Sequence, residues 1–276
     1  MNLPLPWPFE REYMQLALVA GVIVGASAPL IGTFLAQRRM ALLGDGLGHV
    51  AFAGVAAGLL LGVAPVWTAM AAAAGAALTL DVLRTRARAS GELALAVIFY
   101  TGIAAGVVIT SRAGEFDASV LSYLFGSVLT VAPGDVVVVA ALGLGVVAIV
   151  GALSRTLFAI VLDEEAARVA GLPVAAANRL LAVLTAVTVV AAMRVVGLLL
   201  VAALMALPVG AAQVLAKSFR ASLAVAAGIG VGSVIIGLGI ARAADLAPGG
   251  TIVLVAAATF ALASMFSGRR RRPARP

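Results

Sequence analysis

Two side chains early in the sequence are spaced so that they could hold one metal ion. Asp45 and His49 lie in the segment RRMALLGDGLGHVAFAGVA, residues 38–56. A spacing of four residues places both on one face of a helix, one turn apart. A carboxylate and an imidazole in this arrangement can bind a divalent cation. The alternative is structural, an Asp–His hydrogen bond that ties two helices together.

One chain offers few further ligands for such an ion. His49 is its only histidine, and cysteine is absent, which excludes thiolate metal sites, cysteine nucleophiles and disulfides. Two copies meeting at a two-fold axis would bring together two aspartates and two histidines, a set that suits four-coordinate zinc. Manganese prefers more oxygen ligands, and an imidazole does not exclude it. We expect no permanently bound cofactor.

A second segment with a distinct charge pattern is DEEAARVAGLPV, residues 163–174. It predicts a short helix, because acidic residues at its start (Asp163, Glu164 and Glu165) favour an N-terminus, while Gly171 and Pro173 end it. The helix lies in the longest polar loop, 155–178. It is either a plain connector or a docking element for a partner.

The composition indicates that membrane helices position both segments. Of the 276 residues, 63% are hydrophobic and only 11% are charged, and the mean hydropathy is +1.15. Soluble domains are much more charged, so the chain belongs to the membrane class. Its net charge of +7 is explained by basic cytoplasmic loops, so we expect no nucleic-acid partner. No soluble domain interrupts the chain, and 1–276 is predicted to form one domain.

The positions of the charges predict about nine transmembrane helices. A span needs roughly 20 apolar residues, so uncharged runs of that length indicate single spans and longer runs indicate pairs. Single spans are predicted at 13–37, 93–111, 136–154, 221–241 and 246–268. The stretch 50–80, with the residues just before it, gives two spans separated at Pro65, and 180–216 gives two that turn at Arg194. The fold class is therefore an all-α polytopic transmembrane bundle.

The orientation follows from the basic residues. With nine spans and the amino terminus outside, all Lys and Arg lie on the cytoplasmic side except Arg11, Arg112, Arg194 and Arg242. This agrees with the positive-inside rule. A full crossing by 118–134 would invert the second half, so we expect a re-entrant or partial helix there. The C-terminal tail, 269–276, is then cytoplasmic, and its basic residues are expected to contact membrane lipid. Gly-x-x-x-Gly pairs at Gly21/Gly25 and Gly228/Gly232 suggest close helix packing.

The sequence resembles the zinc/manganese-type permeases of ATP-binding-cassette importers. The resemblance rests on the two segments quoted above, on LSYLFGS at 121–127 and on VGLLLVAALMALPVGAAQ at 196–213. Together these cover most of the chain in the order of the family.

This resemblance implies a role for each segment. The 163–174 helix resembles the coupling helix of the family, with Asp163, Glu164, Glu165, Arg168 and Gly171 as the residues expected to couple it to the ATPase. Asp45 and His49 match the polar pair of the metal pathway. The resemblance also implies a homodimer in a bacterial inner membrane, two copies of a cytosolic ATP-binding-cassette ATPase and an extracytoplasmic metal-binding protein.

The expected function is ATP-driven import of a divalent transition metal. The chain has no G-x-x-x-x-G-K-[ST] phosphate loop, so ATP hydrolysis needs a separate subunit and the chain is not itself an enzyme. Zinc is expected because VAFAGVA, which follows His49, is similar to the zinc-type members; manganese or iron is the alternative cargo. A proton-coupled transporter is disfavoured because Asp45 is the one clear carboxylate within a span. An intramembrane metalloprotease would need more histidines.

Overall fold

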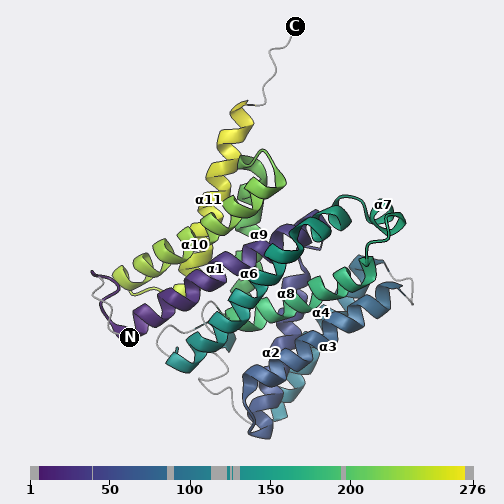
Figure 1. Ribbon diagram of the computed structural model, residues 1–276. Helices are drawn as coiled ribbons and strands as arrows, with labels where there is room; N and C mark the ends of the chain where they lie inside the picture. The colour runs from purple at the N-terminus through teal and green to yellow at the C-terminus, as the bar shows by residue number, and fades with distance from the viewer. Residues whose placement is uncertain are drawn as a thin grey trace.

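The computed structural model describes residues 6–38, 40–85, 90–112, 123–124, 126, 131–193 and 197–270. In this part of the chain the structure consists of helices joined by turns, without strands (Figure 1). The all-α fold class is therefore confirmed. The first four helices are α1 (Glu12–Gln37), α2 (Leu43–Leu61), α3 (Pro65–Thr85) and α4 (Gly91–Arg112). The others are α6 (Pro133–Leu162), α7 (Glu164–Val169), α8 (Val174–Met193), α9 (Leu198–Leu215), α10 (Phe219–Ala243) and α11 (Pro248–Arg270).

Within this described part of the chain, eight helices are long and apolar enough to cross a membrane: α1, α2, α3, α4, α6, α8, α10 and α11. The shorter α9 corresponds to the remaining predicted span, the second of the pair in 180–216. The predicted break at Pro65 is confirmed, because α2 ends at Leu61 and α3 begins at Pro65. The expected re-entrant helix over 118–134, Arg194 and the tail residues 271–276 lie mostly or wholly outside the described residues.

One boundary differs from the sequence-based expectation. The span predicted to end at residue 154 continues through Arg155 to Leu162, making α6 a helix of 30 residues. The charge of Arg155 does not end the helix, because its side chain is exposed and a helical backbone tolerates a charge that reaches water or headgroups. The predicted loop 155–178 is correspondingly shorter, and the helix within it is α7.

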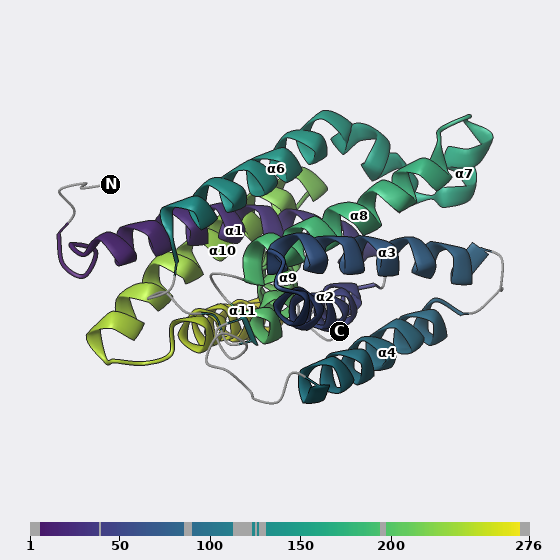
Figure 2. The same cartoon turned by 90° about the horizontal axis from the view of Figure 1, so that it is seen from below.

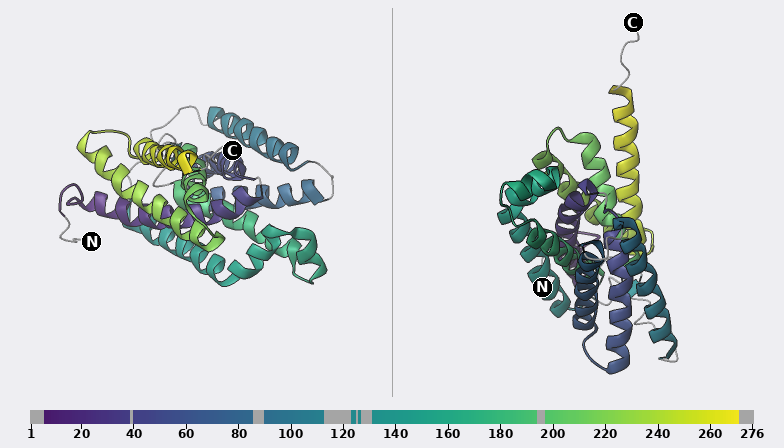
Figure 3. Two further views of the ribbon diagram at one scale, coloured as in Figure 1. Left: turned by 90° about the horizontal axis from the view of Figure 1, so that it is seen from above. Right: turned by 90° about the vertical axis from the view of Figure 1, so that its right-hand side faces the viewer.

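The helices form an inner group covered by an outer one (Figures 2 and 3). Within their most apolar stretches, 67% of α1 and of α2 and 61% of α8 is buried, against 28% of α3, α4, α6 and α11. Helix α1 packs against α10, α6, α9 and α8, while α2 packs against α4, α3, α8 and α9. The candidate metal pair therefore lies on an inner helix, and the outer helices present apolar side chains to lipid.

The contact between α1 and α10 is a direct approach of two backbones at Gly25 and Gly230. A Cβ atom added to Gly25 would lie 2.9 Å from the Gly230 carbonyl oxygen, and one added to Gly230 would collide with the Gly25 carbonyl oxygen. Pro29 has no N–H to donate to that oxygen, so the Gly25 carbonyl lacks its usual partner in the helix. The backbone of Gly230, which carries no side chain, packs directly against the Gly25 carbonyl oxygen.

Of the glycine pairs predicted to pack closely, the one on α1 makes such a contact and the one on α10 does not. Gly25 makes the expected contact, but Gly228 and Gly232 have open space where a Cβ would stand, and Gly230 between them packs instead. A Gly-x-x-x-Gly spacing identifies one face of a helix without fixing which face meets a neighbour.

We expect Gly230→Ala to lower the free energy of unfolding by about 1–3 kcal/mol, because the added methyl group forces α1 and α10 apart. Thermal unfolding of the purified protein in detergent measures this. The matched control is Gly232→Ala on the same helix, where the methyl group meets open space. Equal melting temperatures for the two variants would contradict the assigned contact.

Candidate functional site

Helix α2 carries both residues of the predicted metal pair, near the end of the bundle where α1 turns into α2. Asp45 lies in the first turn and His49 one turn later. Their closest atoms, His49 Nε2 and Asp45 Oδ1, are 3.8 Å apart, which is too long for a hydrogen bond. Both residues belong to the same helix, so the pair does not tie two helices together as the structural alternative required. Both side chains are partly accessible, His49 at 18% and Asp45 at 31%.

A hollow of about 240 Å³ opens beside this pair. Asp45 and Phe99 line it together with Leu42, Glu92, Leu95, Ala96 and Tyr100. The ring of His49 packs edge-on against Phe99, with the ring centres 4.8 Å apart, so α4 fixes the plane of the imidazole. Two carboxylates and two aromatic rings therefore line the hollow next to the pair, among apolar side chains.

Glu92 is a carboxylate of this hollow that sequence reasoning missed. It opens α4, and in the sequence it was only the charge that marked the start of a span. Among the residues that the structure describes, no three His, Asp or Glu side chains come close enough together to hold one ion. Within the described residues, Asp45 and His49 are thus a pair of potential donors without a third His, Asp or Glu beside them.

Helix α7 is a defined structural element, as its sequence predicts. The Asp163 carboxylate accepts a hydrogen bond of 2.9 Å from the Ala166 backbone N–H and so caps the N-terminus. At the other end Gly171 has a φ of +79°. Its N–H bonds to the Arg168 carbonyl, and the Leu172 N–H bonds to the Ala167 carbonyl. This pair of bonds is a Schellman motif, which ends the helix before α8.

The predicted coupling residues fall into three groups in the structure. Asp163 and Gly171 shape the two ends of α7. Glu164 and Arg168 form an ion pair of 3.2 Å one turn apart on its surface. Glu165 is exposed, which leaves its charge available to a partner.

Arg38, the C-cap of α1, is a second residue whose role the sequence did not reveal. It had been counted only as one of the basic residues that set orientation. Its guanidinium donates to Glu164 of α7, at 3.0 Å, and to the Asn178 side chain of α8. These partners lie 126 and 140 residues away in the chain, so no local spacing could have indicated the contact.

The long apolar helices define a multi-pass membrane protein. A model of the ABC 3 transport family matches residues 10–267. The chain belongs to this family, as its resemblance to metal-type permeases predicted. Proton-driven transport, the alternative class, does not fit membership of an ABC family.

Characterised relatives cover nearly the whole chain. The manganese transport system membrane protein MntC of Halalkalibacterium halodurans is 33% identical, over 94% of this chain and 89% of that protein. The protein of the same name from Listeria monocytogenes is 28% identical, over 95% of this chain and 93% of its own length. A solved structure of PsaBC from Streptococcus pneumoniae in complex with Fab superposes with a TM-score of 0.86 at 25% identity, covering 95% of each chain.

We expect Gly171→Ala to loosen α7, because a side chain in the left-handed region costs roughly 1–2 kcal/mol. Amides of residues 166–172 should then exchange with deuterium about tenfold faster than in the wild type. Gly145→Ala is the matched control, since Gly145 lies within α6 and has open space around its Cα. Unchanged exchange in Gly171→Ala would show that the Schellman motif does not hold α7.

Proposed function

We propose that this chain is the membrane-spanning permease of an ATP-driven importer of divalent transition metal, with manganese as its preferred cargo. The observation that carries the proposal is the Asp45–His49 pair, two unbonded metal donors facing one another on an inner helix. Ionisable side chains inside a span are costly and usually line a transport pathway. The names of the relatives from Halalkalibacterium halodurans and Listeria monocytogenes support manganese as the cargo.

The proposed assembly contains two copies of this chain. Each contributes Asp45 and His49, so that the two pairs form a four-donor site on the two-fold axis. No other arrangement of the described residues supplies a third ligand to a single pair. Metal delivered by an extracytoplasmic binding protein reaches this site and leaves through the hollow beside α4.

The energy comes from a separate subunit. The chain has no phosphate-binding loop for ATP, and α7 is proposed as the element on which a cytosolic ATPase acts. In the proposed orientation the amino terminus is outside and the C-terminus is cytoplasmic, in a bacterial inner membrane. This places α7 and the adjacent basic residues Arg38, Arg84 and Arg179 on the cytoplasmic side, in agreement with the positive-inside rule.

Release of the metal requires that the site binds weakly. Two carboxylates and two imidazoles meet this requirement better than thiolates, which hold soft metals tightly, and the chain has no cysteine. The sequence favoured zinc, but the relatives are named for manganese. Glu92, which lines the same hollow, adds carboxylate oxygen at the exit, and manganese prefers oxygen ligands.

We expect Asp45→Asn and His49→Ala each to lower manganese uptake per folded permease at least about tenfold, because loss of one donor per chain removes half of the four-donor set. Uptake is measured in proteoliposomes and normalised to dimeric protein. Asp245→Asn is the matched control, since this carboxylate lies in an exposed turn and is 92% accessible. If His49→Ala shows full uptake per molecule, the imidazole is not a ligand of the site.

The cargo is tested by competition. We expect uptake of radiolabelled manganese by the wild type to persist in the presence of an equal concentration of zinc. His49→Asp, which makes the donor set all oxygen, should raise the ratio of manganese to zinc uptake by about tenfold. If zinc abolishes manganese uptake and is itself carried faster, zinc is the cargo.

A further inference from the structure

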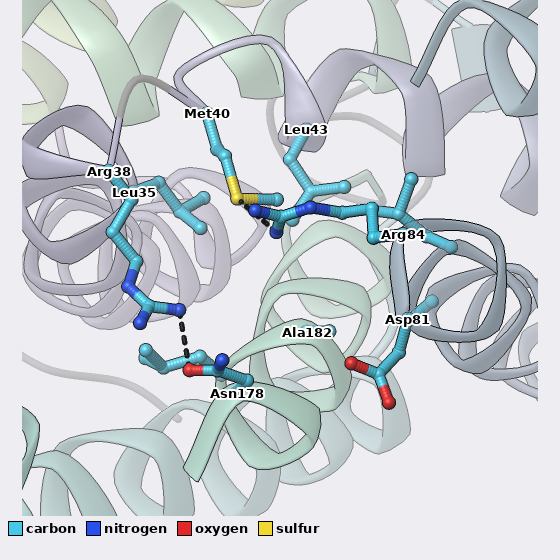
Figure 4. A pocket seen from close by; sticks show the side chains of 11 residues that line it. Leu35, Arg38, Met40, Leu43, Asp81, Arg84, Asn178 and Ala182 are labelled. Carbon is cyan, nitrogen blue, oxygen red and sulfur yellow. Dashed lines mark hydrogen bonds between the residues drawn. The ribbon is translucent and has the colours of Figure 1, made fainter. Parts of the chain in front are cut away.

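The Arg38 side chain joins three helices at the end of the bundle that carries α7. Figure 4 shows it extending from the end of α1 to Asn178 of α8. The other arm of the guanidinium forms an ion pair of 3.0 Å with Glu164 of α7. A planar guanidinium holds two partners in fixed directions, which a lysine cannot do.

The guanidinium is largely removed from water, so its partners matter. The side chain of Arg38 is 11% accessible. Burial lowers its pKa below the usual value, Glu164 opposes this by raising the pKa, and the neighbouring Arg84 lowers it further. An arginine stays charged in spite of such shifts. Without Glu164, the hydrogen-bond partner left to this cation among the described residues would be the neutral amide of Asn178.

The same residue is fixed to the start of the metal-carrying helix. The turn between α1 and α2 is short and hydrogen-bonded: the Met40 N–H bonds to the Leu35 carbonyl, and the Leu43 N–H bonds to the Met40 carbonyl. Arg84 of α3 reaches over the sulfur of Met40 from the other side (Figure 4). This short turn therefore connects Arg38 to α2, which carries Asp45 in its first turn.

Helix α7 has few other attachments. It packs against α6 and α8, its neighbours in the sequence, and within α7 itself Ala167 is the buried residue. Among the described residues, the hydrogen bonds of α7 are local except for the one from Arg38. Arg38 is thus its polar link to the helices that lie earlier in the chain.

We propose that Arg38 is a positioning residue that couples α7 to α2, so that a displacement of α7 by the ATPase moves the helix that carries Asp45 and His49. This inference rests on the proposed function. If α7 moved while the α1–α2 turn stayed in place, the ion pair with Glu164 would break and leave a buried cation beside Arg84. Glu164 is 43% accessible, but Arg38 is only 11% accessible, so loss of the pair costs more than loss of a fully exposed one. The turn is therefore expected to follow α7.

The first experiment measures coupling in the complete complex. Permease and the ATPase that co-purifies with it are reconstituted in proteoliposomes with the binding protein, and manganese uptake per ATP hydrolysed is recorded. We expect Arg38→Gln and Glu164→Gln each to lower this ratio about tenfold, and the double variant to be no worse than either. Arg38→Lys retains the charge but not the planar, two-armed guanidinium, so it should lower the ratio less than Arg38→Gln does.

Arg179→Gln is the matched control, because Arg179 follows Asn178 on α8 and is exposed, and its contact with Asp81 is a loose 3.9 Å. It should leave the ratio unchanged. Additive losses in the double variant, or an unchanged ratio in Arg38→Gln, would overturn the proposal. So would a loss of uptake matched by an equal loss of ATP hydrolysis, which is the result of a merely structural role.

A second measurement does not depend on which metal is carried, or on whether any is. The chain has no cysteine, so spin labels can be placed at Leu42→Cys in the α1–α2 turn and at Val169→Cys in α7, both exposed positions. In the protein with Arg38 intact, we expect one narrow distribution of the distance between the two labels, with and without ATP. In the Arg38→Gln background, we expect this distribution to broaden or shift on ATP binding. Identical behaviour in both backgrounds would refute the coupling, whereas failure of the wild type to import metal would refute only the proposed function.

Discussion

The hydrocarbon core of the bilayer is the constraint on which the rest of this structure depends, because it offers no water to satisfy backbone polar groups. Each described span is a helix, and buried threonine hydroxyls bond within their own helix, as Thr33 does to the Pro29 carbonyl and Thr185 to the Leu181 carbonyl. Lipid tails are as apolar as leucine, so helices associate through close packing rather than through the hydrophobic effect. The backbone contact of Gly25 with Gly230 is an example of such packing between α1 and α10.

The same constraint explains where chemistry is found. Charged groups are tolerated where they keep access to solvent, and Asp45 and His49, at the start of α2, are both partly accessible. Helix α4 brings Phe99 against the imidazole and Glu92 into the lining of the adjacent hollow. The cluster of charges beyond the membrane end of α1 is of a different kind. There Arg38, Glu164 and Asn178 bind each other rather than a solute.

Much of the fold could be predicted from the sequence, because spans are the gaps between charges and turns fall where proline and glycine stand. The break before Pro65 and the end of α7 at Gly171 are examples. The Asp45–His49 pair could be found because both residues lie on one helix at a helical spacing. Three features could not be found: the partners of Arg38, the packing of Gly230 in place of Gly228 or Gly232, and the extension of α6 beyond Arg155. The first two depend on how helices rotate and stack against one another, and the third on whether the Arg155 side chain is exposed. No local pattern encodes either.

The small size of α7 has a mechanical consequence. A helix of six residues is roughly 9 Å long at 1.5 Å per residue, about as long as it is wide. A helix of that shape can rotate about its axis as easily as it can shift along it. A force applied at one point would therefore cause rotation as well as displacement. The two arms of the Arg38 fork run to different helices, α7 and α8. Contacts in two directions restrain rotation of α7 as well as its displacement, so that a force on α7 would move it as a unit with its neighbours.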